Sequence, residues 1–140
     1  MGYIQDRLPR FNKVLAACAE RRPDGEALKE AVFVGQELFN AGLYFDCHEY
    51  LEGIWRRSEG ESKKLLKGLI QAGAALHKIE LDPAARAASL ETLGRALAYL
   101  EATIFLLDVG PERLEPLREI KKKLAQGGFD SSQAPALKLV

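Results

Sequence analysis

Residues 62–81, SKKLLKGLIQAGAALHKIEL, are the stretch that decides the fold. When these residues are placed at about 100° per step on a helix, apolar side chains cover most of the circumference and only a lysine-bearing side stays polar. The apolar positions are Leu65, Leu66, Leu69, Ile70, Ala72, Gly73, Ala74, Ala75, Leu76 and Ile79. The sequence therefore predicts that this helix lies in the middle of a helical bundle.

Apolar spacings of three and four residues recur on both sides of this helix, which indicates an all-α protein. Helices are predicted over about 9–18, 26–40, 45–58 and 83–108, with a last one starting near 112 or 116 and ending near 124. The turn between 58 and 62 is short, so the helices that flank it should be antiparallel neighbours. We predict a compact bundle of five to six helices around this central antiparallel pair.

The length of 140 residues favours a single domain, which we place at residues 1–126. Residues 127–140 contain glycine, serine and proline and are predicted to be a flexible C-terminal tail. The predicted 83–108 helix carries Leu93, Leu97 and Leu100 in a seam that could pack against a second copy, so a homodimer or another homo-oligomer is expected.

Twenty basic and twenty acidic residues cancel, which argues against nucleic acid or an anionic membrane as the partner. A small molecule or another protein fits better. No stretch approaches the roughly 20 apolar residues of a membrane span, and the start has no signal-peptide pattern, so a cytoplasmic location is expected. Cys18 and Cys47 are then predicted to be buried thiols and not a disulfide.

A histidine and two glutamates lie within residues 44–55, YFDCHEYLEGIW. The helical wheel places His48 and Glu52 on the apolar face and Glu49 at its rim. On the central helix, His77 falls in line with the apolar residues of the preceding turns. Both histidines are therefore predicted to face the inside of the antiparallel pair.

Two imidazoles and a carboxylate suit a divalent metal ion such as zinc, iron or manganese. The predicted metal ligands are His48, Glu52 and His77, and Glu49 is the predicted catalytic base acting on metal-bound water. The predicted pocket residues are Tyr44, Phe45, Trp55 and Gln71. This hypothesis makes the protein a metal-dependent hydrolase of a small substrate.

The same residues also fit a protein without a cofactor. His48 and Glu52 are four residues apart and could form a structural pair that hydrogen-bonds a neighbouring helix. The alternative is thus a non-catalytic scaffold or interaction protein whose His/Glu cluster is a buried hydrogen-bond network.

The runs FNAGLYFDCHEYLEGIW at 39–55 and GLIQAGAALHKIE at 68–80 resemble the domain-of-unknown-function 309 family of bacteria and archaea. The family-like core extends over about 26–108. The matching positions are Asn40, Gly42, Tyr44, Phe45, His48, Glu49, Glu52, Trp55, Gly68, Gln71 and His77. The resemblance implies a compact helical bundle, often homo-oligomeric, with a predicted metal-dependent hydrolase activity. The sequence departs from the family where a second histidine commonly follows the first, because Lys78 follows His77 here.

Overall fold

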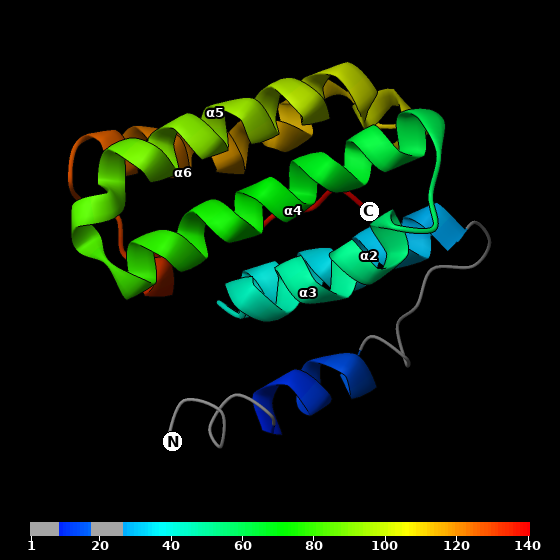
Figure 1. The fold of residues 1–140 in the computed structure, drawn as a ribbon, viewed down its shortest axis with the longest axis horizontal. Helices are drawn as coiled ribbons and strands as arrows, with labels where there is room; N and C mark the ends of the chain where they lie inside the picture. The colour runs from blue at the N-terminus through cyan, green and yellow to red at the C-terminus, as the bar shows by residue number, and fades with distance from the viewer. Residues whose placement is uncertain (1–8, 18–26) are drawn as a thin grey trace.

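The computed structural model describes residues 9–17 and 27–140, and all regular structure within these ranges is helical (Figure 1). The first described helix covers 9–17. The longer helices that follow are α2 (Ala27–Asn40), α3 (Tyr44–Trp55), α4 (Gly60–Leu81), α5 (Arg86–Thr103) and α6 (Glu115–Ala125). Short 3-10 helices lie between and after the longer helices, at Pro83–Ala85, Ile104–Leu107, Pro111–Leu114 and Ser131–Gln133. The predicted all-α bundle is confirmed.

Helix α4 occupies the centre of the bundle, with α3 on one side and α5 on the other (Figure 1). Two glycines bring these neighbours close. A Cβ atom on Gly68 would lie 2.8 Å from Cγ of Leu100 on α5, and one on Gly73 would lie 3.1 Å from the backbone oxygen of Tyr44 on α3. Both values are tighter than ordinary carbon contacts, so the glycines set the helix spacing. The predicted central position of α4 is confirmed.

The start of α3, and with it the candidate site, is positioned by the turn after α2. The N–H of Gly42 donates to the carbonyl of Phe39 at 2.9 Å, and the N–H of Leu43 donates to the carbonyl of Leu38 at 3.0 Å. Gly42 has a φ of +76°, which glycine adopts without steric cost. This pair of bonds is the Schellman motif, and the buried Leu38 and Leu43 provide its apolar contact. Helix α3 begins at the next residue.

Helix α5 is shorter than predicted, and its apolar seam is used inside the molecule. The α-helix ends at Thr103, a 3-10 turn follows, and Asp108 adopts a left-handed φ of 60°. Leu93 and Leu100 are fully buried and Leu97 is 6% exposed, because this face packs on α4 and α6. These leucines are therefore not exposed for pairing with a second copy. An oligomeric state remains a prediction.

The C-terminal segment is packed into the bundle, contrary to the loose tail predicted for 127–140. Leu137 and Leu139 are fully buried. The side chain of Asn40 accepts from the N–H of Leu137 at 2.8 Å and donates to its carbonyl at 2.9 Å. Gln36, 3% exposed, accepts from the N–H groups of Leu139 and Val140 and donates to the carbonyl of Val140. Two amide side chains of α2 thus replace the backbone partners that an irregular buried segment lacks.

Candidate functional site

The face that α3 turns to the core differs from the one predicted. Tyr44, Cys47 and Leu51 are its buried apolar residues, at 2%, 1% and 0% exposure. The side chain of His48 lies at the edge of this face and is 31% exposed, and that of Glu52 is 27% exposed. Because residues one step apart on a helix differ by about 100°, burial of Cys47 turns His48 toward the rim. The prediction that His48 points into the core is wrong.

Three potential metal donors gather at this rim. His48, Glu49 and Glu52 each offer one ligand atom, and these atoms lie within 4.8 Å of one another. Nε2 of His48 is 3.4 Å from Oε2 of Glu52, while Oε1 of Glu52 accepts from Nη2 of Arg56 at 2.7 Å. Arg56 is itself well exposed. The group is therefore half-buried on its apolar side and open to solvent on the other.

An apolar cavity of about 630 Å³ borders this group, between α3 and the end of α4. The Phe45 ring forms one wall, and its centroid lies 6.5 Å from that of the His48 imidazole and 5.1 Å from that of His77. The lining residues are Phe45, His48, Ala74, His77, Lys78, Leu81, Asp82, Ala85 and Ala88. We call this space the Phe45 cavity. It brings both predicted histidines to one site.

His77 does not join the donor group. Among the residues that the structure describes, the set of donors close enough to share one ion comprises His48, Glu49 and Glu52. The structure therefore does not assemble the predicted ligand set of His48, Glu52 and His77. The Phe45 ring contacts both imidazoles, and His77 is half-buried in the cavity wall. Glu49, predicted as the base, lies among the donors instead.

Three of the predicted pocket residues are placed away from the cavity lining. Tyr44 is buried against Phe39, with ring centroids 5.1 Å apart in an edge-to-face arrangement. Burial, with the nearby Glu80 charge, raises the pKa of the Tyr44 phenol far above its usual range. Trp55 lies beneath Lys63, whose Nζ is 4.4 Å from the ring centroid. Gln71 has a buried Oε1 that accepts no hydrogen bond from the described residues.

Cys47 is a free, fully buried thiol, as predicted for a cysteine with an apolar packing role. Burial raises its pKa to about 12. Its Sγ would lie 3.5 Å from a Cβ atom on Gly73, so it fills the close approach of α3 and α4. Cys18 lies outside the described residues.

A helical wheel gives no indication of the residues at the far end of the Phe45 cavity. Leu81 ends α4 with 70% of its surface exposed, and Ala85 and Ala88 follow in the next turns. A large apolar residue at a helix end, directly before the Asp-Pro pair at 82–83, is a signal that sequence reasoning could have used. It marks an apolar surface that the core does not cover.

Comparison with known proteins finds a similarity to one sequence family in the region of this site. Residues 33–90 match the family described as a domain of unknown function, DUF309. The resemblance read from the sequence is confirmed over this range. The DUF309 match covers most of α2, all of α3 and α4, and the start of α5, so the donor group and the Phe45 cavity both fall inside it.

A relative from Aquifex aeolicus (strain VF5), named only as an uncharacterised protein, is 40% identical over 58 residues. The alignment covers 41% of this chain and 16% of the relative, so the shared part is a small portion of that protein. No solved structure matches the chain. Among the described residues, no helix is long and apolar enough to cross a membrane.

Proposed function

We propose that the His48, Glu49 and Glu52 group binds a divalent metal ion and that the protein hydrolyses a small substrate held in the Phe45 cavity. The observation that supports this function most is the spacing of the donor atoms, all within 4.8 Å of one another beside an apolar cavity. Donors about 2.0–2.3 Å from one shared ion are separated by no more than about 4.6 Å. Small side-chain rotations would suffice to close the group.

The donor chemistry fits a first-row divalent ion. One imidazole and two carboxylates suit zinc, iron and manganese, and three protein ligands leave coordination positions open. In the present arrangement Arg56 occupies one oxygen of Glu52 at 2.7 Å. A surface pair of this kind contributes little stability, about 0–1 kcal/mol, so an ion can displace the guanidinium at small cost.

The chain's own residues supply the rest of the chemistry. A bound divalent ion would make a coordinated water acidic enough to ionise near neutral pH. His77, whose imidazole contacts the Phe45 ring, lies outside the donor group and can accept or return a proton at the substrate. The apolar wall of Phe45, Ala74 and Leu81 holds the carbon skeleton of the substrate and excludes water from one side of the site.

Turnover of small nitrophenyl carboxylate and phosphate esters, with and without added zinc or manganese, tests this function. We expect metal-dependent hydrolysis that His48→Ala and Glu52→Gln abolish and that His77→Gln lowers by about a hundredfold, the usual contribution of one acid–base group. Glu91→Gln is the matched control, because Glu91 also pairs with an arginine four residues on, at 2.9 Å, but has no histidine beside it. Metal-independent turnover, or equal turnover in all variants, would refute the proposal.

A non-catalytic scaffold is the second candidate, favoured by the Arg56 bond to Glu52 and by the packing of several family-pattern residues. Asn40 holds the C-terminal segment, Gly42 forms the turn before α3, and Gly68 admits α5. If the protein is a scaffold, the double substitution His48→Leu, Glu52→Leu should leave the stability near that of the wild type. Neither the wild type nor the double variant should then bind metal. Loss of bound metal in that double variant would exclude the scaffold.

A further inference from the structure

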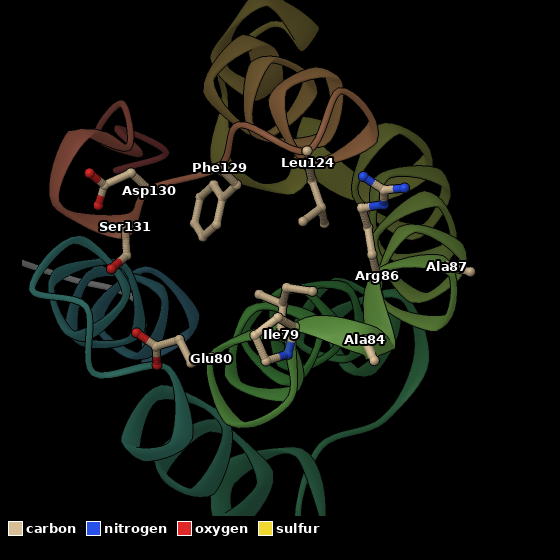
Figure 2. A pocket seen from close by; sticks show the side chains of 11 residues that line it. Ile79, Glu80, Ala84, Arg86, Ala87, Leu124, Phe129, Asp130 and Ser131 are labelled. Carbon is tan, nitrogen blue, oxygen red and sulfur yellow. The ribbon is translucent and has the colours of Figure 1, made fainter.

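A second cavity, of about 610 Å³, lies at the other side of the α4 end, between the start of α5, the end of α6 and the loop that follows α6. Figure 2 shows Ile79, Leu124 and Phe129 pointing into it from three elements. We call it the Phe129 cavity. Its volume falls within the roughly 300–1,000 Å³ of small-molecule sites.

Two side chains of opposite charge line this cavity. Arg86 lies on one side, and Glu80 lies on the opposite side near Ser131 (Figure 2). Both side chains are exposed, and within the described part of the chain neither the Arg86 nor the Glu80 side chain makes a hydrogen bond or an ion pair. Burial raises the pKa of Glu80, although the nearby Arg10 charge acts in the opposite direction. An exposed charged side chain at a cavity wall is open to a charge-assisted hydrogen bond from a ligand.

The acidic side is reinforced by a second carboxylate. Asp130 lines the cavity on the Glu80 side and is fixed in place, because its Oδ1 accepts from the N–H of Ser132 at 3.0 Å and from its hydroxyl at 2.8 Å. These hydrogen bonds lower the pKa of Asp130, so it stays ionised. The cavity thus has a negative end and a positive end separated by apolar side chains.

The positive end is shaped by a glycine. A Cβ atom on Gly127 would lie 2.8 Å from Nη1 of Arg86, so a larger residue would push the guanidinium from its present place. Gly127 also has a φ of +78°. The loop after α6 therefore leaves room for the guanidinium beside the apolar wall.

We propose that the Phe129 cavity binds a small zwitterion, with a carboxylate at Arg86, an ammonium at Glu80, and an apolar body against Phe129 and Ile79. A single ligand of this class satisfies both charges, whereas an ion of either sign would leave one unpaired. The site is separate from the donor group, because Ile79 and Glu80 line this cavity while His77 and Lys78 line the Phe45 cavity. The inference does not depend on the proposed hydrolysis.

Calorimetric titration of the full chain with linear ω-amino carboxylates, from aminobutanoate to aminooctanoate, tests this assignment. The probes lacking one charge, hexanoate and hexylamine, complete the set. We expect one member of the amino-acid series to bind at least about tenfold more tightly than either singly charged probe, since each charge-assisted hydrogen bond contributes roughly that factor.

The variants separate the two ends of the site. Arg86→Gln should lower the affinity for the zwitterion about tenfold and leave the affinity for hexylamine unchanged. Glu80→Gln should also lower the affinity for the zwitterion about tenfold, but leave the affinity for hexanoate unchanged. Lys78→Gln is the matched control, since it lies two residues from Glu80 but lines the other cavity. No heat with any probe, or affinities that neither charge substitution changes, would overturn the proposal.

Discussion

Because the C-terminal segment is packed into the bundle, removing one of its buried side chains should lower the stability of the protein substantially. Leu139 is fully buried, and its N–H is held by Gln36 on α2, so its side chain is part of the main core. Leu139→Ala removes that side chain but keeps the backbone bond. Replacing a buried leucine by alanine costs about 2–5 kcal/mol, from lost transfer free energy and the cavity left behind.

Lys138→Ala provides the control within the same segment. The side chain of Lys138 is exposed, and the backbone carbonyl of Lys138 accepts a hydrogen bond from Nη1 of Arg113 at 2.7 Å. Alanine retains that carbonyl, so the expected change is within about 0.5 kcal/mol. The two variants differ in burial but not in their place along the chain.

Urea denaturation measures the difference, followed by the fluorescence of Trp55, the single tryptophan, and by far-ultraviolet circular dichroism. The account predicts that Leu139→Ala loses about 2–5 kcal/mol of unfolding free energy while Lys138→Ala stays near wild type. Equal stability of both variants and the wild type would mean that the segment is a loose tail, and the reasoning would be refuted.

Three further outcomes follow from the helix contacts and from two titratable groups. Gly68→Ala should cost about 1–3 kcal/mol in thermal unfolding, because its Cβ would lie 2.8 Å from Cγ of Leu100; a stabilised variant would contradict the close approach of α4 and α5. Burial raises the pKa of Glu80, so the folded protein binds more proton than the unfolded chain above the ordinary glutamate range, and stability falls as the pH rises through that window. Glu80→Gln should therefore be more stable than wild type at neutral pH, with the difference vanishing in acid, and equal melting temperatures at neutral pH would show that burial does not penalise the charge. Cys47, with a pKa of about 12, should resist alkylation at pH 8 until the protein unfolds, as peptide mapping would show, and rapid labelling of native protein would contradict its burial.

The sequence was sufficient for the helical architecture and insufficient for the direction of individual side chains. Residues 62–81 are apolar around most of a helix, and that pattern alone indicates a central helix. The orientation of α3 was harder, because Tyr44, Cys47, His48 and Leu51 span a broad arc. In the structure Cys47 is buried and Trp55 is not, so the buried side of α3 is centred on Cys47 and His48 lies at its rim.

Long-range contacts explain the other differences. Nothing local to ALKLV at 136–140 shows that Gln36 and Asn40, about 100 residues earlier, hold its backbone. Nor could helix wheels show that His77 lies outside the donor group, since a wheel gives directions and not distances. The residue types of the candidate site were therefore predictable. That Glu49 and not His77 belongs to the donor group could be seen only from the three-dimensional arrangement.

Metal content is the most direct test of the central claim that His48, Glu49 and Glu52 form the ion site and His77 does not. Protein purified without chelators, beside His48→Ala and His77→Ala variants, would be dialysed against zinc or manganese and analysed for bound metal. We expect near-stoichiometric metal in the wild type and in His77→Ala, and loss of metal in His48→Ala. Equal loss of metal in both variants would show that His48 and His77 are both ligands. No bound metal in the wild type or in either variant would also contradict the claim.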